Sequence, residues 1–274
     1  MNITRLGWAG LELEDSGVTA VIDLLQDPGI MVDFVGEPRT ALPGPSAPGT
    51  AALALVTHLH SDHADPDAIV AALAPDGVLL RPVAADGEYL EVVATKAAEK
   101  RLAELGVEQR VVAPWETVEV GPFRATAIPA ADGFGDPQVS WVVEAGGTRI
   151  LHAGDTLHHG WWWRVAMRLG PIDLAFLPVN GPLVSLPHRQ PASPRPVVMG
   201  PAEAAAAALL LQAGEAIPIH YDALHRAPTY VQTDDPAGAF LREAAALGVA
   251  ARVVEPGERV GTGAPGSPSV PAGY

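Results

Sequence analysis

The sequence predicts a mixed α/β (α+β) protein in which β-sheets are covered on their outer faces by helices. Short β-branched and apolar segments outnumber the helical segments, and helical segments recur after pairs of strands in both halves of the chain. Apolar residues make up 48% of the 274 residues, which is enough for a sizeable core. The chain is longer than most single domains, but one large α/β domain can hold it.

The first half of the chain alternates predicted strands with two helices. The strand signals are β-branched or continuous apolar runs at residues 3–8, 18–22 and 52–57. Residues 36–50 are rich in Pro and Gly and predict a surface loop. A helix over residues 67–74 is indicated by Asp65 as its cap, with proline directly after it. A second helix over residues 95–105 should end at Gly106.

The second half contains most of the predicted strands. They cover residues 107–112, 117–120, 123–129, 139–145, 148–152, 172–177 and 216–220. Helices are expected over residues 161–169, 201–213 and 234–247, and the last of these should end at Gly248. We therefore expect residues 1–260 to form a single domain, followed by a flexible Gly-, Pro- and Ser-rich tail over residues 261–274.

Composition excludes several classes of function. With 17 basic and 32 acidic residues the formal charge is −15, which argues against nucleic acid and anionic membranes as partners. The absence of cysteine excludes disulfides, thiolate metal sites and cysteine nucleophiles. The first residues lack the layout of a signal peptide, and the longest apolar run, residues 204–211, is too short to span a bilayer. We expect a cytoplasmic protein with a small-molecule substrate, and a homo-oligomer stays open.

The strongest local signal is the segment His58-Leu59-His60-Ser61-Asp62-His63, which holds three of the nine histidines. In an extended segment, residues two apart point to the same side, so His58 and His60 can converge on one ion. The chain then turns towards a helix, which lets Asp62 and His63 face the same cavity from a second direction. Imidazole and carboxylate groups suit zinc, manganese or iron, so this segment predicts a metal site rather than a solvated histidine-rich turn.

Two later segments offer further ligands. Gly154-Asp155-Thr156 follows the predicted strand over residues 148–152, and Pro218-Ile219-His220-Tyr221 ends the strand over residues 216–220. Taken alone, the first is more often a turn, and a lone histidine is more often a structural residue.

Together, these segments resemble the metallo-β-lactamase-fold hydrolase superfamily in both order and spacing. Gly7-Trp8-Ala9-Gly10 and Val21-Ile22-Asp23 resemble its opening strands. Met199-Gly200-Pro201-Ala202-Glu203-Ala204, leading to Pro218-Ile219-His220-Tyr221, is similar to the branch of ascorbate-6-phosphate lactonase-like enzymes. The resemblance covers about residues 1–260. It implies a four-layer αββα sandwich with a metal cleft along one edge of the two sheets.

The resemblance also implies the roles of the ligands. His58 and His60 would hold a first metal ion, Asp62, His63 and His220 a second, and Asp155 would bridge the two. A hydroxide held between the ions would be the nucleophile, because a bound metal lowers the pKa of water to near neutrality. Asp62 would additionally orient this nucleophile. The expected cofactors are two divalent ions, zinc or manganese before iron.

One position departs from the family pattern. The family usually supplies a third histidine to the first metal from a loop near mid-chain, and residues 128–138 contain none. Asp132 stands where that histidine is expected, and Asp136 is the fallback. A carboxylate there makes the site harder and favours manganese or iron more than a histidine does. The alternative is that both aspartates only form turns beside glycine.

Further residues are candidates for the substrate pocket. They are His159, Trp161, Asn180, Arg189 and His225, with His188 as a proton donor to the leaving group. Plain surface roles are the alternative for most of them. At least one of the three adjacent tryptophans, 161–163, should belong to the core. Asp23 is expected to support a ligand histidine, and His152 to be structural.

The sequence therefore predicts a metal-dependent hydrolase that cleaves a small-molecule ester, lactone, amide or phosphoester. An iron-dependent oxygen-using or redox member of the same fold is a second reading, because of Asp132. A nuclease is disfavoured by the net charge. A non-catalytic binding protein with a vestigial metal site is the third reading, although six of the seven expected ligand positions carry the residue that the family uses.

Overall fold

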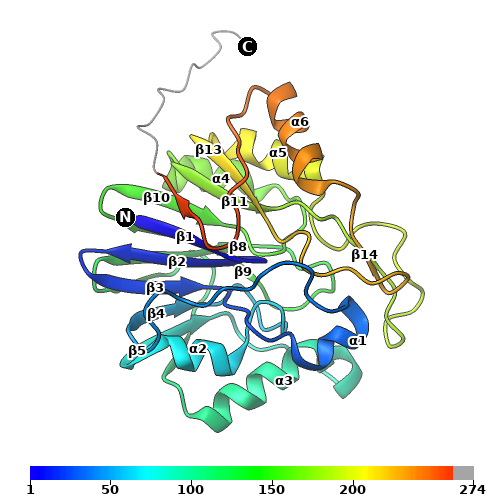
Figure 1. Ribbon diagram of the computed structural model, residues 1–274, viewed down its shortest axis with the longest axis horizontal. Coiled ribbons are helices and arrows are strands. Elements are labelled where there is room, and N and C mark those ends of the chain that lie inside the picture. Colours follow the sequence, from blue (N-terminus) through cyan, green and yellow to red (C-terminus); the bar gives the residue numbers. More distant parts are fainter. Residues whose placement is uncertain (262–274) are drawn as a thin grey trace.

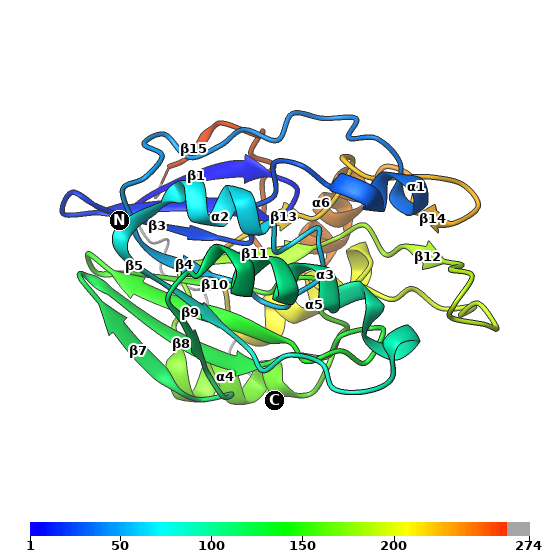
Figure 2. The same cartoon turned by 90° about the horizontal axis from the view of Figure 1, so that it is seen from below.

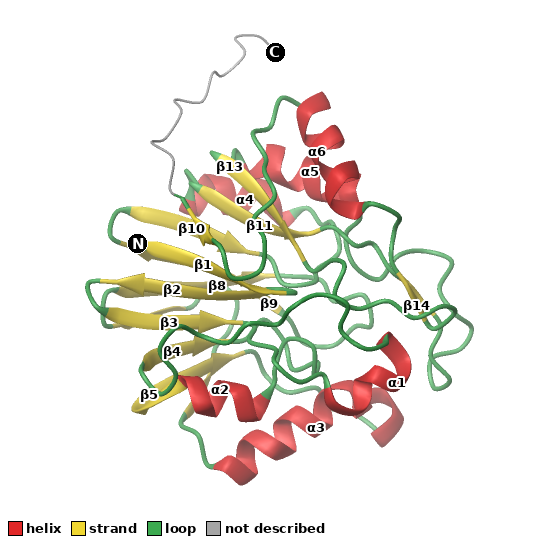
Figure 3. Ribbon diagram, viewed as in Figure 1, coloured by secondary structure: helices red, strands yellow, loops and turns green. Residues whose placement is uncertain are grey.

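The computed structural model describes residues 1–261, in which two large β-sheets pack face to face and helices cover both outer faces (Figure 1). Figure 3 shows the helices in red on opposite sides of the yellow strands. This arrangement is the αββα sandwich predicted from the sequence. The sequence predicts a flexible tail over residues 261–274. Apart from Gly261, these residues lie outside the described part of the chain.

The first sheet is antiparallel at its N-terminal strands and parallel beyond them. Its seven strands within the described range run in the order β15-β1-β2-β3-β4-β5-β6, formed by Arg259–Val260, Asn2–Gly7, Gly10–Asp15, Val18–Ile22, Ala51–Leu55, Leu73–Arg81 and Gln109–Val111. The pairs β3·β4, β4·β5 and β5·β6 are parallel. Parallel neighbours place the carboxyl ends of β3 and β4 at one edge of the sheet, where the histidine-rich segment follows β4.

The second sheet has the same division. Counted over residues 1–261, six strands run in the order β13-β11-β10-β9-β8-β7, formed by Glu215–Ile219, Leu174–Pro178, Thr148–His152, Val139–Ala145, Phe123–Pro129 and Thr117–Val120. The strands β10, β11 and β13 are parallel, so Asp155 after β10 and His220 after β13 emerge at the same edge.

Alternating side chains build three separate hydrophobic cores. In β9, Trp141 and Val143 enter the core between the two sheets, whereas Val142 enters the core between the second sheet and its helices. In β4, Leu53 and Leu55 face the other sheet, whereas Ala54 faces the helices of the first sheet. This period of two fixes the register, because a slip of one residue exchanges the two faces.

The helices divide between the two outer faces. The first sheet is covered by α2 (Pro66–Ala72) and α3 (Tyr89–Leu105), and the second by α4 (Trp161–Leu169), α5 (Pro201–Leu211) and α6 (Pro236–Ala246). Asp65 caps α2 as predicted, accepting a hydrogen bond from the backbone N–H of Ala68 at 3.1 Å. Trp162 is the core tryptophan of its triplet and is fully buried against the second sheet.

Several elements differ from the sequence prediction. The strands β2 and β5 were not expected, nor were the short helix α1 (Val32–Val35) and the two-residue strands β12 (Leu183–Val184) and β14 (Tyr230–Val231). The helix α3 begins at Tyr89 instead of residue 95, because the side chain of Glu91 accepts the backbone N–H of Glu88 at 2.6 Å and stabilises its first turn. Figure 2 shows α1, β12 and β14 together at one end of the sandwich.

Candidate metal centre

The predicted ligands meet at the edge where the parallel strands of both sheets end. His58, His60, Asp132 and Asp155 each place a ligand atom within 4.8 Å of the others. A second group, related in the same way, contains His63, Asp155 and His220, and a third contains His58, Asp62 and His63. The structure therefore brings together all seven residues that the sequence named as metal ligands.

The separations within the cluster are short enough for shared ions. The Nε2 atom of His58 lies 3.5 Å from Oδ1 of Asp155. The Oδ2 atom of Asp62 lies 3.6 Å from Nε2 of His63 and 3.5 Å from Nε2 of His220. Asp155 belongs to both the first and the second group, so its carboxylate is the one that these two groups share.

Two of the histidines are oriented by fully buried partners. Nδ1–H of His63 donates to Oδ2 of Asp23 at 2.7 Å, and the hydroxyl of Thr57 donates to the same oxygen at 2.7 Å. Nδ1–H of His58 donates in turn to the Thr57 hydroxyl at 3.1 Å. Asp23 thus fixes the tautomer of His63 by a direct hydrogen bond and that of His58 indirectly, through Thr57.

The other two histidines are oriented from different segments. Nδ1–H of His220 donates to Oδ1 of Asn180 at 3.0 Å. His60 differs from the other three histidines because it donates through Nε2–H and not through Nδ1–H. Its Nε2–H donates to Oδ2 of Asp136 at 2.8 Å, and its Nδ1 faces Oδ2 of Asp132 at 3.9 Å. In all four histidines one ring nitrogen is held by an acceptor and the other faces the cluster.

The atoms that face the cluster fit a bound cation. Within residues 1–261, five of them are buried without a hydrogen-bond partner: Nε2 of His58, His63 and His220, Oδ2 of Asp132 and Oδ1 of Asp155. Leaving buried polar atoms unpaired is costly, and native structures rarely do so. A divalent ion satisfies imidazole nitrogens and carboxylate oxygens together, so this donor set fits zinc, manganese or iron.

The two carboxylate oxygens of Asp132 fit the two roles considered for it. Its Oδ1 accepts the backbone N–H groups of Phe134 and Asp136 at 2.7 and 3.0 Å, which closes the turn. Its Oδ2 faces the cluster. The fallback assignment of Asp136 as a ligand is wrong, because this carboxylate is occupied by His60 and by Arg189, 3.4 Å away, and it belongs to none of the three ligand groups.

The carboxylates of the cluster favour positive charge at two of the four histidines, whereas burial lowers the pKa of His58 well below its usual value and that of His220 to about 4. Burial disfavours the charged ring of His60, but the hydrogen bond to Asp136 and the carboxylates of Asp132 and Asp155 outweigh it and raise the pKa of His60 to about 9. Burial is likewise outweighed at His63, where Asp62 and Asp23 raise the pKa to about 10. The carboxylates therefore draw positive charge into a buried site, which divalent ions deliver.

Trp8 is a site residue that the sequence reasoning did not assign. Its Nε1–H donates to Oδ2 of Asp62 at 3.1 Å, and its ring lies 4.0 Å from the ring of His220. The backbone of Trp8 has a φ of 46°, and its carbonyl accepts the N–H of His220 at 2.9 Å. The only sequence signal for Trp8 was its position, together with Ala9, between the two glycines Gly7 and Gly10.

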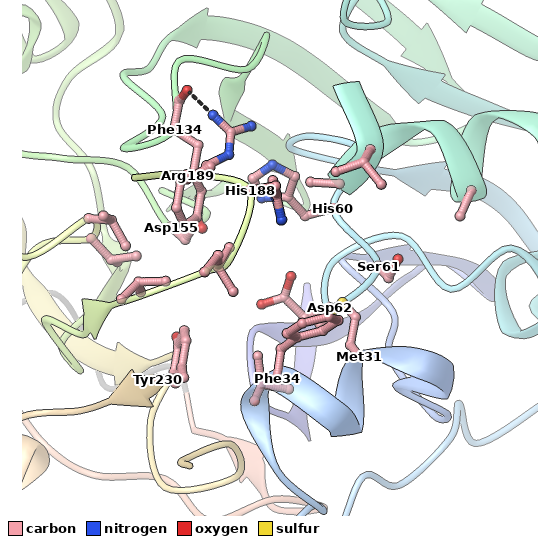
Figure 4. Close-up of a pocket in the computed structure, with 18 residues that line it drawn as sticks. Met31, Phe34, His60, Ser61, Asp62, Phe134, Asp155, His188, Arg189 and Tyr230 are labelled. Carbon is pink, nitrogen blue, oxygen red and sulfur yellow. Dashed lines mark hydrogen bonds between the residues drawn. The ribbon is translucent and has the colours of Figure 1, made fainter. Parts of the chain in front are cut away.

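A cavity of about 170 Å³ opens beside the cluster (Figure 4). Its polar lining includes His60, Asp62 and Asp155, together with Ser61, His188, Arg189 and Tyr230. The hydroxyl of Tyr230 accepts Nδ2–H of Asn180 at 2.8 Å, so Tyr230 retains its own proton for another acceptor. Nothing in the sequence pattern marked Tyr230 beyond a short Thr-Tyr-Val strand signal.

The predicted substrate residues divide into two sets. His188 and Arg189 line the cavity, as expected. Asn180 does not, because it is fully buried behind His220 and Tyr230 and orients both. Its assignment to substrate binding is therefore corrected to a structural role at the metal cluster.

His159, Trp161 and His225 also lie away from the cavity lining. His159 stacks on Trp162 with ring centres 4.1 Å apart, and Trp161 packs at 6.3 Å against Trp115 on the outer side of the second sheet. Tryptophans at adjacent helical positions diverge, and α4 turns Trp161 away from the ligands.

His152 is structural as predicted: its Nε2–H donates to the carbonyl of Ala9 at 2.7 Å. In the described part of the chain, the helices are all too short or too polar to cross a membrane.

Fold and ligand set together define a metal-binding αββα sandwich of the metallo-β-lactamase class. The family model described as a beta-lactamase superfamily domain matches residues 23–221. A UPF0173 metal-dependent hydrolase of Thermus thermophilus is 29% identical over 259 residues, covering 94% of this chain and 97% of the relative. One from Methanopyrus kandleri is 30% identical over 268 residues, covering 94% and 98%. The chain therefore belongs to the β-lactamase superfamily, within the UPF0173 metal-dependent hydrolases.

Solved structures show the same fold at lower identity. Igni18, a metallo hydrolase from the archaeon Ignicoccus hospitalis, superposes with a TM-score of 0.64 at 19% identity, over 94% of this chain and 97% of that one. CmlA, a diiron β-hydroxylase from Streptomyces venezuelae, superposes with a TM-score of 0.68 at 18% identity. The match covers 94% of this chain and 53% of CmlA. These likenesses concern the fold alone.

Proposed function

We propose that the protein is a metal-dependent hydrolase that uses two divalent ions to cleave an ester, lactone, amide or phosphoester bond in a small molecule. The observation that carries this proposal is the set of five buried, unpaired donor atoms that converge beside the cavity. The relatives named as metal-dependent hydrolases support the reaction class. The similarity of residues 199–221 to the ascorbate-6-phosphate lactonase-like branch supports including lactones among the substrates.

The chain's residues divide between two ions. His58, His60 and Asp132 would hold the first ion, and Asp62, His63 and His220 the second, with Asp155 shared. When bound, such ions supply hydroxide from water near neutral pH and polarise the oxygen of a carbonyl or phosphoryl group. Trp8 holds Oδ2 of Asp62, which keeps this carboxylate at the cavity wall, where it would orient the nucleophile.

Tyr230 is the stronger candidate for donating a hydrogen bond to an oxygen of the substrate. Burial raises the pKa of Tyr230 well above its usual value, so its hydroxyl stays protonated. Asn180 already donates to this hydroxyl, which turns its proton towards another acceptor. Burial and the neighbouring Arg189 lower the pKa of His188, which weakens the predicted role of His188 as the proton donor to the leaving group.

The test of this function is metal content measured together with activity. Protein purified without chelator or a metal-binding tag should contain about two equivalents of zinc or manganese by plasma mass spectrometry. Chelation should abolish hydrolysis of a panel of esters, lactones, amides and phosphoesters, and adding the metal back should restore it. Hydrolysis that persists in metal-free protein would overturn the proposal.

A second function is favoured by Asp132. Its carboxylate offers the first ion an oxygen ligand where the family usually has a histidine nitrogen, and oxygen ligands suit iron. A diiron hydroxylase also has the same fold. Iron in the purified protein, with oxygen consumed during turnover, would favour oxygen chemistry over hydrolysis. The variant Asp132→His should shift metal selectivity towards zinc, because imidazole is the softer ligand. Unchanged selectivity in this variant would show that Asp132 does not bind the ion.

A further inference from the structure

The cavity beside the metal cluster has a wall that is almost entirely apolar. It is formed by three segments that carry none of the proposed ligands, namely the region of α1, one face of α3 and the chain from β12 to α5. The apolar lining residues of these segments are Met31, Phe34, Val35, Val93, Ala94, Ala97, Val184, Leu186, Val197 and Val198, and Phe134 joins them from the turn that carries Asp132. Such a wall takes up an apolar group and offers few partners to a polar one.

We propose that this cavity selects an uncharged acyl compound, an ester, lactone or amide, that carries one apolar group about the size of an aromatic ring. The proposal rests on the hydrolase function proposed above and narrows its substrate class. It excludes phosphoesters, which that function leaves open.

The size of the apolar group follows from the volume of the cavity. The cavity measures about 170 Å³. Apolar cavities of ~150 Å³ in other proteins stay dry and bind benzene. One ring therefore fits beside the reacting bond, whereas two rings exceed the space.

The absence of net charge follows from the state of Arg189, the one permanently cationic side chain among the lining residues of the described chain. Its NH1 donates to the carbonyl of Phe134 at 3.0 Å, and its NH2 donates to the carbonyl of Glu91 at 3.1 Å. NH2 also lies 3.4 Å from the carboxylate of Asp136, and the guanidinium stacks 5.0 Å above the ring of Phe134. Figure 4 shows its bond to Phe134.

These contacts leave Arg189 with little to offer an anion. A side chain recognises phosphate through a fork of guanidinium donors or a free ammonium group. Here the fork is engaged by two carbonyls, and its charge is balanced by Asp136. Among the described residues, the lining therefore offers no free cationic side chain to an anion, and the apolar wall favours an uncharged substrate.

The polar and apolar groups of the cavity are segregated, which sets the orientation of the substrate. Figure 4 shows Asp62, Tyr230 and Phe34 reaching towards the same space from different elements. The acyl group lies against Asp62, Asp155 and Tyr230, and the ring lies against α1 and α3. Hydrolysis joins a water oxygen to the acyl carbon and breaks the bond to the leaving group, which receives one proton of that water.

The test compares matched substrates on the metal-loaded protein. Methyl acetate lacks the apolar group, methyl phenylacetate carries one ring, methyl 4-biphenylacetate carries two, and benzyl phosphate is the charged comparison. We expect kcat/KM for methyl phenylacetate to exceed that for methyl acetate by at least about 10-fold, since burial of a ring is strongly favourable. The biphenyl ester and benzyl phosphate should both be poorer substrates than methyl phenylacetate.

Binding of an uncleavable analogue supplies a readout that is independent of turnover. Benzyl methyl ketone should bind in calorimetric titrations to both the metal-loaded and the metal-free protein. Ala94→Phe fills the cavity from α3, and we expect it to abolish this binding and to remove the preference for the phenyl ester. Ala103→Phe adds the same side chain at an exposed position of α3 outside the lining, and it should keep both properties.

The outcomes separate the two proposals. Preferred cleavage of benzyl phosphate, or equal cleavage of methyl acetate and methyl phenylacetate, would overturn the substrate class while the hydrolase function stands. Ketone binding that Ala94→Phe removes, with none of the esters, lactones, amides and phosphoesters cleaved by the metal-loaded protein, would support the cavity's selectivity and overturn the hydrolase function. Absence of both binding and cleavage would overturn both.

Discussion

The ligands of the metal cluster are held in place by two different kinds of support. His58, His63 and His220 are oriented by Asp23, Thr57 and Asn180, all of them fully buried where the strands end. His60 and Asp132 are supported instead by the turn over residues 132–136 and by Asp136, which Arg189 contacts from the loop between β12 and α5. Folding of the sandwich fixes the first set of ligands, whereas the second set depends on loops that also border the cavity.

The largest effect should come from Asp155, the residue that two of the ligand groups share. Asp155→Ala removes a carboxylate shared by two ligand groups, and loss of metal assistance is worth several kcal/mol. We expect kcat/KM to fall by about 10³-fold or more and at least one metal equivalent to be lost. The control Asp86→Ala removes an exposed aspartate and should change neither. Full activity with unchanged metal content in Asp155→Ala would disprove the bridge.

The support for the core ligands should also be important for stability. Asp23→Asn replaces a buried carboxylate that accepts three hydrogen bonds, from the backbone and hydroxyl of Thr57 and from His63. We expect the free energy of unfolding to fall by about 3 kcal/mol, together with weaker binding of both ions. Denaturant titrations of metal-free and metal-loaded protein separate the two effects. A variant that lost metal affinity but no stability would contradict a role for Asp23 in the core.

The support for the loop ligands should affect metal binding but not folding. Asp136→Asn weakens the acceptor of His60 Nε2–H, and such changes beside a ligand cost about 10-fold or more in metal affinity. Calorimetric titration should show one weakened and one unchanged ion, with the unfolding free energy of the metal-free protein altered by less than about 1 kcal/mol. Equal weakening of both ions would remove the distinction between the two kinds of support.

The smallest effect is expected at Trp8. Trp8→Phe removes the N–H that holds Asp62 and should lower kcat/KM by about 3- to 10-fold, the value of one hydrogen bond. Trp141→Phe is the matched control, since Trp141 is equally buried and its Nε1–H donates to the carbonyl of Val56 within the core. Both variants should lose similar stability, and only Trp8→Phe should lose activity. Equal losses of activity would assign Trp8 a purely structural role.

Four of the proposed ligands could be predicted from the sequence because their signal is local. His58, His60, Asp62 and His63 lie within six residues, and the spacing of two in an extended segment is a geometric property of the chain. The remaining ligands and the four layers of the sandwich came from the family resemblance, whereas periodicity alone predicts sheets covered by helices. The strand β5 was missed because Pro, Asp and Gly at residues 75–77 interrupt its apolar residues.

The residues that orient the ligands and line the cavity could not be predicted in the same way. Asn180 and Tyr230 are 50 positions apart and meet only because two loops cross at one end of the sandwich. Trp161 illustrates the opposite error, because an aromatic triplet beside a ligand suggested a pocket. The helix α4 turns Trp161 towards Trp115 instead. Contacts between distant segments depend on packing that composition and periodicity do not specify.

The division of labour between segments has an evolutionary consequence. Most of the proposed ligands follow strand ends fixed by the two sheets, whereas the apolar wall comes mainly from α1, α3 and the chain between β12 and α5. Substitutions or insertions in those wall segments alter which molecules enter while the reactive groups stay in register. Related proteins can therefore evolve different substrate specificities by changes in one wall segment at a time. A protein designer can likewise combine wall segments from different relatives on this scaffold.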